Sequence, residues 1–592
     1  MQYFSLIKFL SNELDLNKTD IRKPPKSEMG DLSLRIQGSF DEVKSKADHI
    51  EEKLRNIASV EIIGNYINLK FKEDFLLEMI LNVGKYPNEA VREDIPKSYL
   101  IEYSAPNTNK PLHLGHARNS VLGMSLANLY EFVGNKVSKV NLVNDRGIHI
   151  CKSMMAYMLF GDGRTPETEK IKGDHFVGDY YVMFEKECLR QAQAILEGKE
   201  LKKENFKEDD WKEKVEEAKE ETLIMQNARN LLKKWENGEP ETIGLWEKMN
   251  SWVVEGINKT YDRFGSKFDK YYYESETYRL GKDMIEKGLE RGILKRREDF
   301  AVYCDLEEFG FGKKVLLRAD GTSVYMTQDL GTTKLKYEDS KADKLIWVVA
   351  SEQKYHFQVL FKVLELLGYE FAKNCFHYSY EMVDLPTGRM KSREGTVIDL
   401  DDLLDALKER VLEIIKEREM EISGNIEETA DNIGKAALKY FILSHRPGSK
   451  ITFDIENSLA FEGKTGPYVL YQYVRAGKIL EKAVFLNLYE NLQIDKIDLF
   501  EQEDKKHIHN LLISLLQFAD VIKESAEVMD QTKIADLIYN LARSFSSFYN
   551  DVNVLKEEIP EKKEILLFIV FVFKRLLGVC LDILGIEKVE EM

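Results

Sequence analysis

The sequence predicts an α/β protein with a doubly wound parallel sheet at its centre, a small α/β module before it and a helical bundle after it. From about residue 95, apolar strand-like runs alternate with amphipathic helical segments, the pattern of a parallel sheet covered by helices. From about residue 402 onward, the apolar periodicity is helical throughout. We therefore expect parts at residues 1–88, 95–405 and 406–592, with a helical insertion at about 151–300 and a bundle from about 465.

The N-terminal part has a pattern of its own. Helix-like segments from Phe4 to Leu14 and from Phe40 to Ile57 precede the run VEIIGNYINLKF, residues 60–71. Apolar and polar residues alternate on both sides of Gly64, a residue suited to a tight turn. We expect two strands joined at Gly64 and packed with the helices into a small module.

The stretch that organises the central part is SYLIEYSAPNTNKPLHLGHARN, residues 98–119. Its apolar start predicts a buried strand, its two prolines predict a turn, and the residues that follow predict a helix. Free N–H groups and the helix dipole make such a helix N-terminus favourable for anions. His113 and His116 can donate hydrogen bonds to phosphate from one face, while Gly115 leaves room for a flat base. The pattern predicts a nucleotide site.

Residues 106–119, PNTNKPLHLGHARN, resemble the HIGH signature of class I aminoacyl-tRNA synthetases in the form used by arginyl-tRNA synthetases. The segments GDLSL (30–34), DHFVGDYY (174–181) and LLGVCLDILGIEKVEEM (576–592) are similar to landmarks of the same family. The resemblance implies a Rossmann-like catalytic domain, an N-terminal module that contacts tRNA and a C-terminal domain that binds the anticodon. For DHFVGDYY we expect a packing role. The chain departs from the family at Arg146, where an aromatic residue is usual.

Five polar residues fall at or just past the ends of predicted strands, where an open parallel sheet collects its ligands. A guanidinium is planar, permanently charged and rich in donors, so it needs fixed acceptors, best supplied by carboxylate. Within the resemblance, Asp329 and Tyr325 would meet the guanidinium of arginine, with Glu102 as a second acidic partner. Asn107 and Gln353 would hold its α-amino end. Lysine could not fill the same planar fork and would leave acceptors unpaired.

The segment GRMKSREGTVIDLDDLL, residues 388–404, occupies the place of the KMSKS loop, the second class I signature. The match is degenerate, because Arg389 replaces the first lysine and Ser392 fills the usual position of the second. Many arginyl enzymes share such a loop, and a lysine just before the HIGH element, here Lys110, is thought to compensate. The resemblance therefore predicts a cation set and a set of ATP contacts. The cations are Lys110, Lys391 and Arg393, and the ATP contacts are His113, Gly115, His116, His356, Met390, Lys391 and Ser392.

Composition narrows the class of protein. The net charge of −17 and the pI of about 5.4 argue against non-specific coating of nucleic acid, although local basic stripes can still bind RNA. No run reaches the apolar length of a membrane span; the most apolar is ILLFIVFVF, residues 565–573. The five cysteines are far apart and form no C-x-x-C pair, which favours reduced thiols in a cytoplasmic protein and no structural metal.

The resemblance implies a two-step reaction. The carboxylate of arginine attacks the α-phosphate of ATP, bound with Mg²⁺, to give arginyl-adenylate, and a terminal ribose hydroxyl of tRNA(Arg) then takes the arginyl group. Neither step needs a protein nucleophile, so catalysis would come from positioning and charge stabilisation. The family also implies a monomer whose activation step requires bound tRNA. Three alternatives stay open: a nucleotidyl transferase with the same histidine motif, a synthetase for another amino acid, and a synthetase-like tRNA-binding protein without charging activity.

Overall fold

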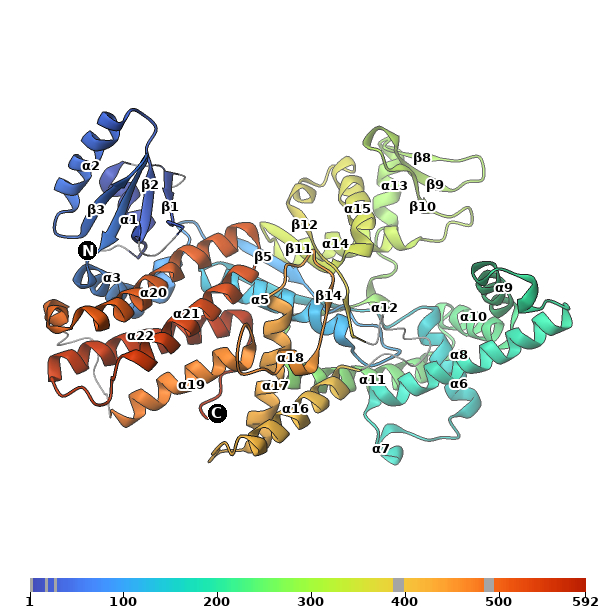
Figure 1. The fold of residues 1–592 in the computed structure, drawn as a ribbon. Coiled ribbons are helices and arrows are strands. Elements are labelled where there is room, and N and C mark those ends of the chain that lie inside the picture. Colours follow the sequence, from blue (N-terminus) through green and yellow to red (C-terminus); the bar gives the residue numbers. More distant parts are fainter. Residues whose placement is uncertain (1–3, 16, 18–19, 26–28, 387–398, 484–493) are drawn as a thin grey trace.

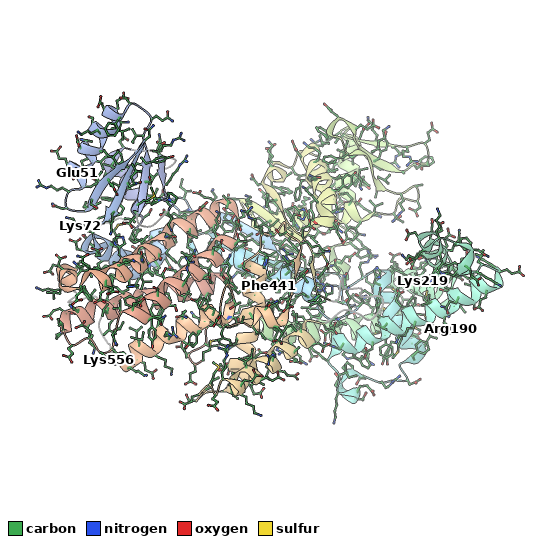
Figure 2. The ribbon with its side chains drawn as sticks, viewed as in Figure 1. Glu51, Lys72, Arg190, Lys219, Phe441 and Lys556 are labelled. Atoms are coloured by element: carbon green, nitrogen blue, oxygen red, sulfur yellow. The ribbon has the colours of Figure 1, made fainter. Side chains whose placement is uncertain are left out.

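The computed structural model describes residues 4–592 with the exception of 16, 18–19, 26–28, 387–398 and 484–493. The N-terminal module lies at one end of the molecule beside the C-terminal helices, and the helical insertion projects at the other end (Figure 1). Glu51 and Lys72 mark the first of these ends and Arg190 and Lys219 the second (Figure 2). The parallel sheet lies between them.

The N-terminal module is a four-stranded antiparallel sheet in the order β1-β2-β4-β3 with two helices against it. Gly64, at φ +61°, makes the turn between the last two strands, as the sequence predicts. A capping box between Ser39 and Glu42 begins the second helix. The elements are α1 (Leu6–Leu14), β1 (Ile21–Arg22), β2 (Leu32–Arg35), α2 (Phe40–Leu54), β3 (Ala58–Ile63) and β4 (Tyr66–Phe71).

The central sheet has five parallel strands in the order β12-β11-β5-β6-β7. After β5, the chain adds β6 and β7 on one side of it. It later adds β11 and β12 on the other side, so the direction of winding reverses between β5 and β11. That reversal leaves a crevice at the carboxyl ends of the strands, and the predicted doubly wound sheet is confirmed. The elements are β5 (Ser98–Glu102), α5 (Leu114–Phe132), β6 (Lys136–Val143), β7 (Lys270–Tyr273), α14 (Tyr325–Ser340), β11 (Lys344–Ala350), α15 (Lys354–Leu366) and β12 (Cys375–Tyr380).

Two insertions separate β6 from α14. The first is helical, but it ends earlier than expected: Gly265, at φ +79°, caps its last helix, and Lys270–Tyr273 then pair with β6. The second is a helix pair with a three-stranded antiparallel sheet, which the sequence analysis did not predict. The elements are α6 (Ile148–Phe160), α7 (Pro166–Glu169), α8 (Gly173–Gly198), η3 (Lys203–Asn205), α9 (Glu208–Glu221), α10 (Leu223–Glu236), α11 (Pro240–Phe264), α12 (Glu274–Thr277), α13 (Lys282–Glu290), β8 (Leu294–Arg296), β9 (Val302–Leu306), η4 (Glu307–Phe309) and β10 (Gly312–Leu317).

The described residues of the remainder form helices and one short parallel strand pair (β13 with β14). The apolar run 565–573 lies inside the bundle, where Phe573 stacks on Phe545 with ring centroids 4.0 Å apart. Within the described residues, no helix combines the length and the apolar character that crossing a bilayer requires. The elements are η5 (Ser351–Gln353), η6 (Glu370–Asn374), β13 (Val383–Asp384), α16 (Leu400–Glu417), α17 (Ile426–Leu443), β14 (Ile451–Thr452), α18 (Ile455–Ser458), α19 (Gly466–Lys482), η8 (Ile494–Leu499), α20 (Gln502–Val528), α21 (Thr532–Asp551) and α22 (Pro560–Leu584).

A buried histidine joins the N-terminal part to the bundle. Helices α3 (Glu73–Lys85) and α4 (Pro87–Val91) pack on α20, where His509 is 6% exposed. Its Nδ1 donates to Glu73 Oε1 at 2.9 Å and its Nε2 donates to Asp31 Oδ1 at 2.7 Å. Burial alone would lower the pKa of His509, but the hydrogen bonds to the two carboxylates outweigh it and raise the pKa to about 9.

The raised pKa of His509 predicts that the stability of the contact between the N-terminal part and the bundle depends on pH. Because the folded-state pKa lies above the usual 6.5, the stabilisation is complete below pH 6.5 and is lost as pH rises toward 9. We expect the difference in free energy of unfolding between wild type and His509→Gln to shrink by about 3 kcal/mol over that range. Urea unfolding of the transition that includes the N-terminal module measures it. The exposed His49→Gln serves as the control, and a difference independent of pH would contradict the assignment.

Candidate active site at the carboxyl edge of the parallel sheet

The chain leaves β5 through two consecutive residues in the left-handed region, Ser104 (φ +76°) and Ala105 (φ +48°). This conformation is strained for residues with a side chain and persists only where neighbours fix it. Here two amide side chains do so: the Ser104 N–H donates to Asn119 Oδ1 at 2.5 Å, and the Ala105 N–H donates to Asn141 Oδ1 at 3.0 Å. The strain therefore sets the path of the turn that carries the histidines.

His113 is the N-cap of α5, and both histidines of the turn accept backbone hydrogen bonds. His113 Nδ1 accepts from the Gly115 N–H at 3.1 Å, and His116 Nδ1 accepts from the His113 N–H at 3.1 Å. Burial lowers the pKa of His113 to about 3, helped by the charge of Lys110, and burial likewise lowers that of His116. Both rings are thus neutral with their proton on Nε2, so each presents one N–H donor to a ligand.

Gly115 and Lys110 complete the turn. A Cβ at Gly115 would lie 2.9 Å from His113 Cε1, so glycine here makes room for the imidazole itself. The admission of a flat base, which the sequence analysis assigned to Gly115, stays a prediction. Lys110 is close enough to both imidazoles to act on their pKa values. The turn therefore combines two neutral donors with one cation, a set suited to phosphate oxygens.

Asp329, Tyr325 and His356 come together beside the same edge. Asp329 Oδ2 accepts a hydrogen bond from His356 Nε2 at 2.6 Å, and the rings of Tyr325 and His356 are 5.9 Å apart. Tyr325 is 59% exposed, so a ligand can reach its ring and hydroxyl. His356 was expected to contact ATP; it lies against the acid expected to contact arginine, and the ATP contact stays a prediction.

The other three predicted arginine contacts differ in character. Glu102 is 5% exposed and forms an ion pair with the buried Lys336 of α14, so its charge is already balanced inside the protein. Asn107 and Gln353 are exposed. Asn107 forms a backbone bridge to Asn144 at the end of β6, and Gln353 caps α15 just beyond β11. Two exposed amides therefore lie just past strand ends, while Glu102 is the less suited of the two predicted acids.

Glu274 is an acid of this edge that the sequence analysis missed. It directly follows β7, and its side chain is 16% exposed. Burial raises its pKa to about 7; Arg146 opposes that rise, and the negative charges of Asp145 and Asp329 add to it. Glu274 and Asp329 are thus close enough for their charges to interact. The signal was available, since Glu274 stands at the end of an apolar strand-like run, as the other candidates do.

Arg146, where the chain departs from the family pattern, lies beside Glu274. Its guanidinium lies over the ring of Tyr278 at 4.1 Å and that of Trp235 at 5.3 Å, and it pairs with Glu236 at 2.8 Å. It also lies 4.0 Å from Glu274. The arginine packs on rings from α10 and from the chain after α12 and places one positive charge beside Glu274.

The predicted residues Met390, Lys391, Ser392 and Arg393 lie in segment 387–398, outside the described residues. The chain after that segment returns to the histidine turn. Asp399 forms an antiparallel backbone bridge with His113, and the Leu400 N–H donates to the Leu112 carbonyl at 2.8 Å. The start of α16 is therefore attached to the N-terminus of α5.

Comparison with known proteins identifies the family. A family model described as class I (R) tRNA synthetases, catalytic domain, matches residues 77–455, and one for the DALR anticodon binding domain matches 469–592. The arginine–tRNA ligase of Parabacteroides distasonis is 40% identical over 98% of this chain and 96% of its own length. That of Treponema denticola is 42% identical over 91% and 89%.

Solved structures agree on the fold. The arginyl-tRNA synthetase of Thermus thermophilus superposes with a TM-score of 0.73 at 23% identity, covering 99% of this chain and 98% of its own. That of Plasmodium falciparum gives 0.70 at 18% identity, covering 97% and 94%. On the family models and the near full-length identity of about 40%, this chain belongs to the arginyl-tRNA synthetase family of class I aminoacyl-tRNA synthetases.

Proposed function

We propose that this chain attaches arginine to tRNA(Arg) at the expense of ATP. The observation that carries the proposal is that one edge of the sheet holds two different groups of side chains, hydrogen-bond donors with a cation and a pair of acids. Neutral imidazole donors and Lys110 stand at the start of α5, and the acids Asp329 and Glu274 stand with Tyr325 nearby. Arginyl-adenylate carries a guanidinium at the end of its side chain and a phosphate between its carbonyl and the ribose, so it offers a partner to both groups.

Recognition of arginine would depend on the two acids. A guanidinium offers five donors in one plane, and a carboxylate takes two of them in parallel. Asp329, oriented by His356, and Glu274, flanked by Arg146, would accept from different edges of that plane. Lysine has a single ammonium and would leave acceptors unpaired, a loss of roughly 1–3 kcal/mol for each buried group.

Activation of arginine needs placement rather than a protein nucleophile. The substrate carboxylate attacks the α-phosphate, and pyrophosphate leaves. The Nε2–H groups of His113 and His116 would donate to phosphate oxygens, and Lys110, Lys391 and Arg393 would balance the charge that shifts toward pyrophosphate. The tRNA ribose hydroxyl then attacks the arginyl carbonyl, and AMP departs. Because burial keeps both imidazoles neutral, they act as donors and not as charge partners.

Two surfaces suit the RNA partner. Arg22 and Lys23 are exposed at β1 of the N-terminal module. On the bundle, the Arg475 guanidinium lies 4.6 Å from the Tyr471 ring and 4.4 Å from the Tyr549 ring. Arginine and tyrosine faces of this kind stack on unpaired bases. We propose the first surface for the body of tRNA and the second for its anticodon region, in a monomeric cytosolic enzyme.

Charging assays test the function. With arginine, ATP, Mg²⁺ and tRNA, we expect aminoacylation, and we expect pyrophosphate exchange only when tRNA is also present. Lysine tests whether a single ammonium can replace the guanidinium, and citrulline tests the loss of positive charge at constant shape. Neither amino acid should be attached to tRNA. A protein that binds tRNA but charges none of the three amino acids would be the synthetase-like RNA-binding protein instead.

Asp329→Ala tests the guanidinium contact. Loss of a charged hydrogen-bonding partner should raise the KM for arginine by about 10- to 100-fold, with the KM for ATP unchanged. Steady-state charging kinetics measure both constants. Glu338→Ala removes an exposed acid from the same helix and should leave both constants unchanged. An equal rise in both constants for Asp329→Ala would mean that the acid supports the site as a whole.

Glu274 predicts a pH dependence of arginine affinity. Its pKa near 7 means that the free pocket gains its second negative charge as pH rises through 7. Binding of a guanidinium favours the ionised form, so affinity should increase by about 10-fold for each pH unit below 7 and level off above it. Glu274→Gln should abolish this slope, whereas the exposed Glu276→Gln should keep it. Calorimetric titrations from pH 6 to 8.5 measure the slope, and a wild-type affinity that is flat over this range would refute the assignment.

A further inference from the structure

We propose that His175 is a positioning residue for arginine ligation: by bridging Asp399 and Asp401, it holds the start of α16 against the turn that carries His113. His175 belongs to the DHFVGDYY motif, residues 174–181, for which the sequence analysis expected packing alone. The inference rests on the proposed function, because ligation is its readout.

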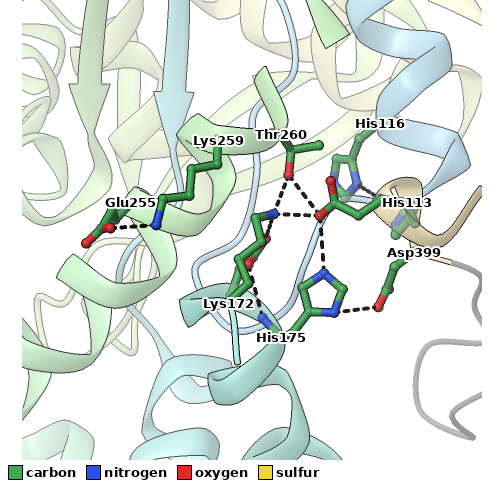
Figure 3. Close-up of polar contacts among 10 residues, drawn as sticks. His113, His116, Lys172, His175, Glu255, Lys259, Thr260 and Asp399 are labelled. Atoms are coloured by element: carbon green, nitrogen blue, oxygen red, sulfur yellow. Dashed lines mark hydrogen bonds and ion pairs between the residues drawn. The ribbon is translucent and has the colours of Figure 1, made fainter. Parts of the chain in front are cut away.

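Both nitrogens of the His175 ring face a carboxylate. Nδ1 lies 3.4 Å from Asp399 Oδ2, and Nε2 lies 3.2 Å from Asp401 Oδ2 (Figure 3). A neutral imidazole has one donor and one lone pair, so it would turn that lone pair toward one of the two acids. The imidazolium has two donors and satisfies both. A bridge between two ionised carboxylates therefore requires the charged ring.

Lys172 completes an ion network rather than leaving a metal site. Among the described residues, Asp174, His175 and Asp401 have ligand atoms within 4.8 Å of one another, a spacing that could hold a metal ion. The Lys172 ammonium, however, donates to Asp401 Oδ2 at 2.6 Å, to Asp174 Oδ2 at 3.0 Å and to Thr260 Oγ1 at 2.5 Å. A cation is thus already supplied by the chain itself, and the network joins α8, α11 and α16.

The DHFVGDYY motif also packs directly against the turn that carries His113. A Cβ at Gly178 would come within 3.0 Å of Pro111 Cδ and 3.6 Å of the Lys110 Cα, so α8 packs closely on the turn because this position is glycine. On the other side of the network, Asp399 bridges His113 through the backbone. Helix α8 therefore contacts the turn before His113 through Gly178 and reaches His113 through Asp399. A displacement at His175 would move the imidazole donors.

The charged groups around His175 limit the ionised His175–Asp399 pair to a range of pH. The groups that face it are Asp399, Asp401, Asp174, Asp179 and Lys172. The hydrogen bond to Asp401 raises the pKa of His175 above 6.5, against the opposing effects of burial and Lys172, and burial raises that of Asp399 to about 6. The ionised pair is lost below pH 6 when Asp399 gains a proton. It is lost again when pH rises above the pKa of His175.

Three variants test the proposal: His175→Gln, Asp399→Asn and the double variant. Because misplacement of reacting groups by about 1 Å costs on the order of 100-fold, we expect each single variant to lose about 10- to 100-fold in kcat for charging. The KM for arginine should stay unchanged, since neither residue faces the guanidinium acids. The double variant should lose no more than the worse single variant, because one bridge is broken in all three. The exposed His49→Gln should behave as wild type.

The pH profile separates positioning from a merely structural role. In wild type, kcat should fall as pH rises through the pKa of His175, and this alkaline limb should be absent in His175→Gln. Wild-type kcat and an unchanged alkaline limb in His175→Gln would overturn the proposal, as would additive losses in the double variant. If His175→Gln does not fold, Asp399→Asn with wild-type kcat would overturn it equally. Failure of the wild type to charge arginine would instead refute the proposed function.

Discussion

The site depends on two backbone N–H groups that each occupy an imidazole Nδ1. These hydrogen bonds, from Gly115 to His113 and from His113 to His116, fix the tautomer of both rings and aim their remaining donors. Burial then keeps the rings uncharged near neutral pH. A neutral donor of this kind stabilises developing charge without a change in its own protonation, which is what a preorganised phosphate site requires. The strained residues Ser104 and Ala105 bring the turn to that position.

The order of strands explains how distant parts of the chain reach one crevice. The strands pair in parallel, so the carboxyl ends of β5, β6, β7 and β11 share an edge, and the winding reverses beside β5. The start of α14 adds Asp329 and Tyr325 from a different layer. The acids proposed for the guanidinium and the imidazoles proposed for phosphate thus stand on elements at one edge of the sheet. Lysine is rejected because it would leave buried acceptors in the pocket unpaired. This requires a rigid pocket, since one that relaxed around lysine would no longer discriminate against it.

Much of this arrangement could be predicted from local patterns. The alternation around Gly64, the strand that ends at Glu102 and the helix after His113 follow periodicity and turn residues that act within a few positions. The pairing of Glu102 with Lys336 could not be predicted in this way, because two residues more than 200 positions apart meet only when α14 packs on the sheet. The small sheet β8-β9-β10 was missed for a related reason. Its strands have only three, five and six residues, so each gives a short signal beside the surrounding helical pattern.

Glu274 and His175 illustrate two kinds of missing information. Glu274 stands at a strand end like the other candidates, so a stricter use of the same rule would have found it. The role of His175 depends on Asp399 and Asp401, which lie more than 200 residues later and approach it only where the start of α16 meets the start of α8. A motif whose partners come from a distant part of the chain has no local signature of its own. Its chemistry becomes visible only in three dimensions.

A crystal structure with a non-hydrolysable analogue of arginyl-adenylate tests the central claim most directly. The account predicts the guanidinium within hydrogen-bond distance of both Asp329 and Glu274, with the Nε2 atoms of His113 and His116 turned toward the phosphate mimic. A guanidinium bound away from those acids, or histidines that meet the analogue through Nδ1, would contradict it.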